Sequence, residues 1–163
     1  FLQKFCFDKR IILKILPRTN EKAELEFFSN IIKRESFIYL NKRLINSYNE
    51  IDKSDICVFI SSTLGYESLA RNKKVAAFCI RKLRLESSKF GWPNKFRDTG
   101  KFWTNKPNIR KFDKIMNYLI KTSDTDWKKH SISFKKKIMF FDKKNLKLNL
   151  ILKKYYESNL KNA

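Results

Sequence analysis

The sequence contains little glycine, proline, cysteine or histidine, and each shortage excludes a class of protein. Only 3 of its 163 residues are Gly and 3 are Pro, too few for a collagen-like chain or a flexible linker. Its cysteines, Cys6, Cys57 and Cys79, are odd in number and widely separated, which argues against a disulfide framework and a zinc site. We interpret them as buried thiols. With His130 as the sole histidine, a Ser–His–Asp triad and metal-dependent hydrolysis are both poorly supported.

Long apolar runs and two common nucleotide motifs are also missing. No uninterrupted apolar stretch approaches the roughly 20 residues of a membrane-spanning helix. Neither G-x-x-x-x-G-K-[ST] nor G-x-G-x-x-G occurs, so nucleoside triphosphate and dinucleotide sites lack their motif. The chain begins at Phe1 rather than Met, and we expect it to be a fragment that lacks an N-terminal half.

Acidic residues are scarce beside basic ones, 16 against 37, which gives a formal charge of +21. One interpretation is a nucleic-acid-binding domain. The other is a solvated basic surface produced by compositional drift, because the chain is rich in Lys, Asn, Ile and Phe. The charge extends along the whole chain and is not confined to one arm. Net charge speaks to association rather than to fold, so both interpretations stay open.

Apolar strand patterns alternate with helical ones, which predicts an α/β domain. Strand patterns occupy residues 11–16, 37–40, 56–60 and 75–79, and helical patterns occupy 21–33 and 64–72, with a short helical or loop segment at 44–53. Apolar strands separated by helix-length segments are typical of a doubly wound, Rossmann-like parallel sheet covered on both faces. We expect a single domain over 1–163, with the sheet and a long loop at about 11–106 and C-terminal helices at 107–163.

The C-terminal part reads as helices at 108–120 and 123–130, followed by one or two more within 132–160. Six apolar side chains of this last stretch are expected to face inward: Phe134, Ile138, Phe141, Leu148, Leu152 and Tyr155.

The strongest chemical signal follows the strand at 56–60. Ser61, Ser62 and Thr63 stand where a helix opens, and Gly65 and Glu67 follow. Free N–H groups at a helix start, with hydroxyls beside them, form a ready anion site. Serine and threonine are also ordinary helix caps, and the Thr63–Glu67 spacing is close to a capping box. A phosphate site and a cap are both compatible with this pattern.

The strand–Ser-Ser-Thr–Gly–x–Glu–helix pattern resembles the C-terminal, donor-binding half of GT-B glycosyltransferases. It is most similar to bacterial enzymes that build surface carbohydrates, including those that use CMP-sugars. Their paired serines match Ser61 and Ser62. The segment K-I-L-P-R, Lys14 to Arg18, is similar to their K-P-H-P-R pattern but has Leu16 at the histidine position. CMP-, UDP-, GDP- and dTDP-sugars therefore all remain possible donors.

The resemblance implies transfer of a sugar from a nucleotide donor to a glycan or lipid-linked acceptor. It implies that Glu67, with Gly65 beside it, holds the donor ribose. The base that activates the acceptor would come from the missing half, so the isolated chain would bind nucleotide weakly without turnover. No metal and no cofactor are expected. The expected location is cytoplasmic, at the inner face of the membrane, where the Lys-rich run 128–144 could contact anionic lipid.

Sugar transfer leaves negative charge on the departing nucleotide, and an enzyme without metal must stabilise that charge with helix N-termini, hydroxyls and cations. Lys14 and Arg18 are cations at the carboxyl end of a predicted strand, and Arg can grip phosphate with two hydrogen bonds. We therefore assign them, with Ser61, Ser62 and Thr63, to the donor phosphate. Ordinary roles also fit: a solvated strand-edge lysine, and a turn arginine paired with Glu21.

The loop 89–103 mixes aromatic and basic residues. This mixture fits sugar or base stacking, and it also fits single-stranded nucleic acid. From this loop Trp92, Arg97 and Asp98 are candidate donor contacts, and the resemblance makes a lid role plausible. The alternative is a loop folded back over the sheet with its aromatic side chains buried.

Overall fold

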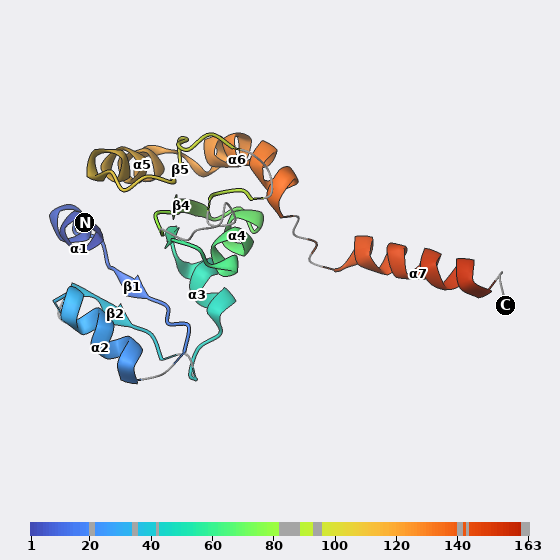
Figure 1. Ribbon diagram of the computed structural model, residues 1–163, viewed down its shortest axis with the longest axis horizontal. Coiled ribbons are helices and arrows are strands. Elements are labelled where there is room, and N and C mark those ends of the chain that lie inside the picture. The colour runs from blue at the N-terminus through green and yellow to red at the C-terminus, as the bar shows by residue number, and fades with distance from the viewer. Residues whose placement is uncertain are drawn as a thin grey trace.

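The computed structural model describes residues 1–19, 22–33, 36–41, 43–81, 89–92, 96–139, 142 and 144–160, and it shows alternating helices and strands (Figure 1). The helices are α1 (Leu2–Lys9), α2 (Lys22–Ile31), α3 (Ser47–Lys53), α4 (Thr63–Ala70), α5 (Ile109–Lys121), α6 (Asp124–Ile138) and α7 (Leu146–Leu160). The strands are β1 (Lys14–Ile15), β2 (Ile38–Tyr39), β3 (Ile56–Phe59), β4 (Lys74–Phe78) and β5 (Trp103–Thr104).

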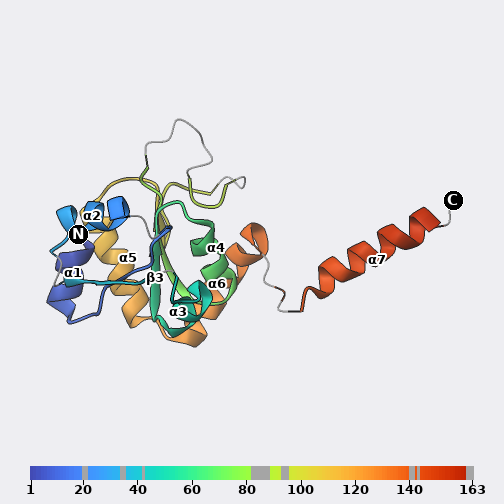
Figure 2. The same cartoon turned by 90° about the horizontal axis from the view of Figure 1, so that it is seen from below.

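The core is a parallel sheet of order β3-β4-β5 with β4 in the middle. Side chains of β4 are buried on both faces because helices cover both. Phe78 packs on Phe112 of α5 with ring centroids 4.4 Å apart, whereas the next residue, Cys79, lies near Tyr66 of α4. Figure 2 shows α5 on one side of β3 and α4 and α6 on the other. The predicted Rossmann-like α/β class is confirmed.

A second, smaller sheet pairs β1 with β2 in parallel, with Lys14 opposite Ile38. All four predicted strands exist, but among the described residues no ladder joins β1 to β3, so the predicted single sheet is divided. Each of these strands has only two residues and is partly exposed. Such short strands bury little apolar area. A visible link from β1 toward the rest of the domain is an ion pair between Lys14 and Glu50 of α3.

The predicted C-terminal helices form, although α6 continues to Ile138 and does not end at His130. The expected inward-facing side chains are right for α6 and wrong for α7. Phe134 and Ile138 pack against the core, as expected. Leu148, Leu152 and Tyr155 were expected to face inward but are exposed, because α7 projects away from the domain (Figure 1). Phe141 lies outside the described residues. Two elements were not predicted: α1, which brings Phe5 into the core, and β5 within the long loop.

The cysteine prediction agrees with the structure. All three thiols are free; Cys6 and Cys79 are buried, and Cys57 is partly buried. Burial raises the pKa of Cys79 to about 11. Because the thiolate is the nucleophile, this thiol is unreactive near neutral pH.

Gly65 is required by packing. A Cβ at this position would lie 2.1 Å from Cγ of the Phe59 ring, which is itself buried. We expect Gly65→Ala to lower the free energy of unfolding by about 1–3 kcal/mol, the usual cost of overpacking. Urea denaturation measures this. In an uncrowded helix the same change would stabilise by up to about 1 kcal/mol, so a more stable variant would contradict the contact.

Candidate functional site

The turn from β3 into α4 presents three exposed hydroxyl residues, Ser61, Ser62 and Thr63. Ser62 is the N-cap residue of α4, yet its side chain makes no cap hydrogen bond. Three other helices begin differently: Asn46, Asn108 and Ser123 each accept a hydrogen bond from a backbone N–H of the helix that they precede. The simple cap interpretation of Ser62 is therefore not realised here.

The start of α4 has the features of an anion site. The first N–H groups of a helix have no partner within it and carry partial positive charge. In the described part of the chain, no hydrogen bond engages the hydroxyls of Ser61, Ser62 or Thr63. Phe59 precedes the turn and Gly65 follows it. Both are buried, and the Phe59 ring packs directly on Gly65, which fixes the two ends of the turn relative to each other. The turn can thus offer N–H and O–H donors together to one anionic group.

Glu67 lies on α4, and its partner is a residue that sequence reasoning missed. The hydroxyl of Tyr48 on α3 donates to Oε2 of Glu67 at 2.6 Å. This hydrogen bond to the carboxylate raises the pKa of Tyr48. Arg71 lies over the Tyr48 ring, 5.3 Å from its centroid, and pairs with Asp52. The capping-box role for Glu67 is thus replaced by a contact between helices that holds the carboxylate in place.

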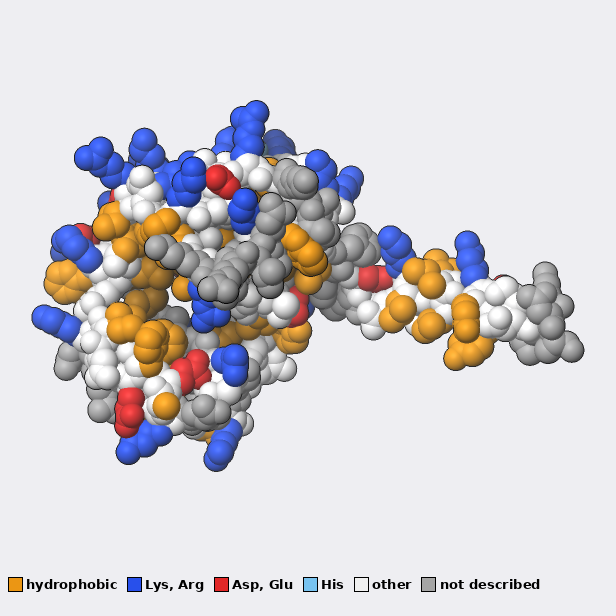
Figure 3. Space-filling view, in the orientation of Figure 1, with side chains coloured by type: hydrophobic (Ala, Val, Ile, Leu, Met, Phe, Trp, Pro, Cys, Tyr) orange, Lys and Arg blue, Asp and Glu red, His pale blue; other side chains and the backbone are white. Residues whose placement is uncertain are grey.

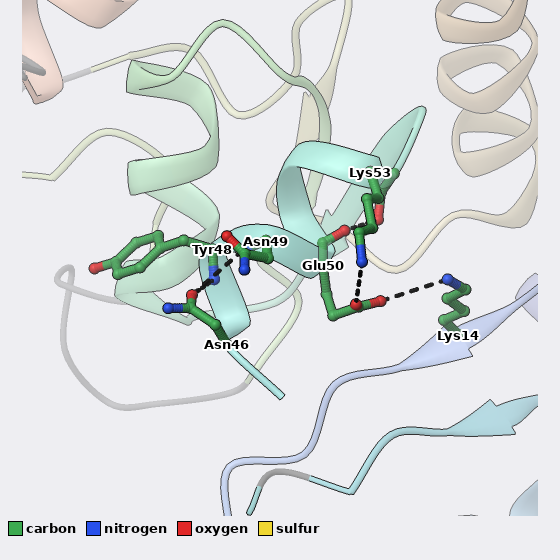
Figure 4. Close-up of polar contacts among 7 residues, drawn as sticks. Lys14, Asn46, Tyr48, Asn49, Glu50 and Lys53 are labelled. Atoms are coloured by element: carbon green, nitrogen blue, oxygen red, sulfur yellow. Dashed lines mark hydrogen bonds and ion pairs between the residues drawn. The ribbon is translucent and has the colours of Figure 1, made fainter. Parts of the chain in front are cut away.

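Lys14 is directed toward α3 (Figure 4). Its Nζ lies 3.4 Å from Oε2 of Glu50, whose other oxygen is 3.5 Å from Nζ of Lys53. No ion pair or hydrogen bond within the described residues joins Lys14 to the Ser61–Thr63 turn. A phosphate role for Lys14 would require exchange of Glu50 for the ligand, and it stays a prediction.

Arg18 lies in the loop after β1, which Glu24 of α2 organises. The Glu24 carboxylate accepts from the backbone N–H groups of Arg18 and Thr19, both at 2.9 Å, and from the Thr19 hydroxyl. Partial burial acts to raise the pKa of Glu24, but these hydrogen bonds and the Arg18 charge outweigh it and hold the pKa below its ordinary value. The expected alternative partner, Glu21, lies outside the described residues.

Acidification tests the role of Glu24. A carboxyl with a depressed folded-state pKa stabilises the fold above its unfolded value, about 4.3, and the stabilisation is lost as pH falls through the folded value. We expect the wild type to lose more stability than Glu24→Gln between about pH 5 and pH 3, measured by urea denaturation across the series. Equal losses in the two proteins would contradict this contact.

The aromatic loop divides into a buried part and one exposed residue. Four of its aromatics, Phe90, Phe96, Phe102 and Trp103, form a cluster in or against the core. The burial expected under the alternative interpretation therefore holds for Phe90, Phe102 and Trp103, and in part for Phe96. Trp92 differs, with 56% of its surface exposed. The N–H of Gly91 donates to the Tyr66 hydroxyl at 3.2 Å, which attaches the turn before Trp92 to α4, the same helix that the hydroxyl turn opens.

Arg97 and Asp98 are placed at the base of this loop. The carbonyl of Arg97 accepts from the Trp103 indole at 3.0 Å. Asp98 pairs with Lys106 at 3.3 Å, and the hydrogen bond from that lysine lowers the pKa of the Asp98 carboxyl. The visible contacts of both residues are structural, and their donor roles remain predictions.

Comparison with known proteins adds a family. A family model described as "putative O-antigen biosynthesis protein" matches residues 1–156. The chain belongs to this family. No curated protein and no solved structure matches the chain. Membership in the O-antigen biosynthesis family links the chain to surface carbohydrate biosynthesis, as the sequence resemblance implied.

Over the residues that the structure describes, no helix is both long enough and apolar enough to cross a bilayer.

Proposed function

We propose that the chain is the nucleotide-sugar-binding domain of a GT-B glycosyltransferase of the O-antigen biosynthesis family. It would serve transfer of a sugar to a surface glycan or lipid-linked acceptor. The observation that carries the proposal is the hydroxyl turn Ser61–Thr63 at the carboxyl end of β3. Ligands of open α/β sheets bind at such strand ends.

The turn supplies what the departing nucleotide needs. When the bond between sugar and phosphate breaks, the electron pair stays on the phosphate oxygen, and N–H and O–H donors aimed at that oxygen stabilise the charge. Ser61, Ser62 and Thr63 provide the hydroxyls, and α4 provides the N–H groups and its dipole. The helix fixes the direction of its first N–H groups before a ligand arrives, whereas the three exposed hydroxyls can rotate toward the phosphate.

Two neighbouring groups give the site its second contact region. Glu67, held by Tyr48, offers a carboxylate oxygen to a ribose diol. Trp92, attached to α4 through Gly91 and Tyr66, offers an exposed ring that could stack on the base or sugar. With Glu67 four residues beyond Thr63, phosphate and ribose contacts would come from one helix, about one turn apart.

Calorimetric titration with CMP, UDP, GDP and dTDP tests the proposal. We expect one of these nucleotides to bind the wild type, and Glu67→Ala to weaken its affinity about 10- to 150-fold, because a hydrogen bond to a charged group contributes about 1.5–3 kcal/mol. Glu26→Ala, a change of the same kind on α2, is the matched control because, among the described residues, its carboxylate pairs only with exposed Lys22. The control variant should bind as the wild type does.

The nucleic-acid alternative predicts a different set of affinities in the same calorimetric titrations. Single-stranded oligonucleotides would bind tightly, with an affinity that falls steeply as salt rises, and Glu67→Ala would not weaken them. That pattern, with no binding of any of the four nucleotides, would overturn the proposal.

A further inference from the structure

Helix α7 carries apolar side chains that no part of the described domain covers. Leu148, Ile151, Leu152 and Tyr155 are exposed, with Leu148 at 53% and Leu152 at 43%. They follow the i, i+3, i+4, i+7 spacing that places side chains on one face of a helix. In Figure 1 the helix extends from the domain beyond α6. An isolated helix of 15 residues is marginal in water without a surface to pack on, so a partner that covers this face would stabilise the helix.

Cations flank the apolar face. Lys147 and Lys154 lie one turn to either side of Ile151, along the edge of the face. Figure 3 shows lysines along one edge of α7 beside its apolar side chains. Residues 128–160 contain ten lysines and only two acidic residues, Asp142 and Glu157, for a net charge of +8. A partner must therefore accept apolar side chains while carrying negative charge.

We infer that α7 is an anchor that lies in the interface of an anionic lipid bilayer, with the face of Leu148, Leu152 and Tyr155 toward the acyl chains. An anionic bilayer provides both an apolar layer and a negative surface, and helices with this arrangement bind in its plane. Lysines beside the apolar face can extend toward lipid headgroups while their methylene stems stay in the apolar zone. Tyr155 and Tyr156 have an apolar ring and a polar hydroxyl, which suits the same boundary.

A second copy of the chain satisfies these requirements less well. Two copies would bring together two surfaces of the same sign, each belonging to a chain of charge +21, and like charges at short range oppose association. A bilayer rich in phosphatidylglycerol is negatively charged and therefore attracts the same positive surface. The inference does not depend on the proposed nucleotide site, because α7 and the turn Ser61–Thr63 lie in different parts of the chain.

Vesicle flotation tests the anchor with the full chain. One probe is vesicles of phosphatidylcholine with about 30% phosphatidylglycerol, which gives the vesicle a negative surface potential. The other probe is vesicles of pure phosphatidylcholine, which carry no net charge. We expect the wild type to float with the anionic vesicles and at least tenfold less with the neutral ones. Binding to the anionic vesicles should weaken as salt rises.

Two double variants on α7 locate the contact. Leu148→Asp with Leu152→Asp changes the proposed face, and Leu146→Asp with Leu150→Asp makes the same charge change on the other side of the helix, where both leucines are also exposed. We expect the first pair to lower vesicle partitioning at least tenfold and more than the second pair does. Both proteins should unfold like the wild type in urea, since α7 lies outside the hydrophobic core.

Three results would overturn the anchor: no flotation with anionic vesicles, equal partitioning onto neutral and anionic vesicles, or equal losses in the two double variants. A dimer in light scattering, together with no flotation, would identify a second copy as the partner of α7. Loss of nucleotide binding in the proposed site would leave the flotation result unchanged, so the two proposals fail separately.

Discussion

Phe90→Ala is expected to lower the free energy of unfolding by about 3–5 kcal/mol, the usual cost of removing a buried phenylalanine. The Phe90 side chain is 1% exposed. Its ring stacks on Trp103 at 5.0 Å and on Tyr66 at 5.7 Å, and meets Phe102 edge-on at 5.5 Å. The substitution therefore leaves a cavity where β5, α4 and the loop meet. Urea denaturation followed by circular dichroism measures the loss.

Trp92→Ala is the matched control in the same turn. Trp92 is largely exposed, and exposed substitutions usually change stability by less than about 0.5 kcal/mol. If Trp92→Ala destabilised as much as Phe90→Ala, the division of this loop into a buried cluster and one exposed ring would be wrong. If both changes were neutral, the aromatic cluster would not be part of the core.

Ser62→Asp is expected to abolish nucleotide binding, a loss of 100-fold or more, while leaving the fold as stable as before. Aspartate at an N-cap position is at least as favourable as serine and interacts well with the helix dipole, by about 0.3–1 kcal/mol. The same carboxylate would stand where the nucleotide phosphate is proposed to bind, and would repel it. The substitution therefore removes nucleotide binding without lowering stability. Calorimetry with the nucleotide that the wild type binds, together with urea denaturation, measures both.

Asn108→Asp provides the comparison at another helix. Asn108 is the N-cap residue of α5 and accepts from the backbone N–H of Lys111 at 3.0 Å, so the substitution adds the same charge at a helix start outside the proposed site. We expect wild-type binding. A Ser62→Asp protein that bound nucleotide normally would show that the serine is only part of a helix start.

The strand and helix types could be predicted because most segments carry a strong local pattern. The strand at 56–60 and the helix at 108–120 have apolar residues at the spacing of their own structure, and both formed within a residue or two of the expected bounds. The strand at 103–104 could not be recognised, since it has two residues inside a loop. Its burial depends on rings from distant segments, such as Phe90 and Phe134.

The error at α7 has a different cause. Leu148, Leu152 and Tyr155 have helical spacing, and that spacing correctly predicts a helix with an apolar face. It does not specify which surface the face contacts. Burial against the domain was the ordinary assumption, and the structure leaves the face exposed.

In the candidate site, the residues of the β3–α4 turn were found because they are contiguous in sequence. Tyr48 was missed because its role depends on α3 meeting α4, which places its hydroxyl 2.6 Å from Glu67 across 19 positions of sequence. The partner of Lys14 was missed for the same reason, since Glu50 reaches it from 36 positions away.

The most direct test of the nucleotide-binding proposal is a map of backbone amide shifts. The ¹⁵N-labelled chain is titrated with CMP, UDP, GDP and dTDP, and the shifted amides are assigned. The proposal predicts that one nucleotide shifts the amides of Ser61 to Gly65 together with those of Gly91 and Trp92. No shift at millimolar nucleotide would contradict it, and so would shifts confined to the pocket lined by Gln3, Arg10 and Ser36.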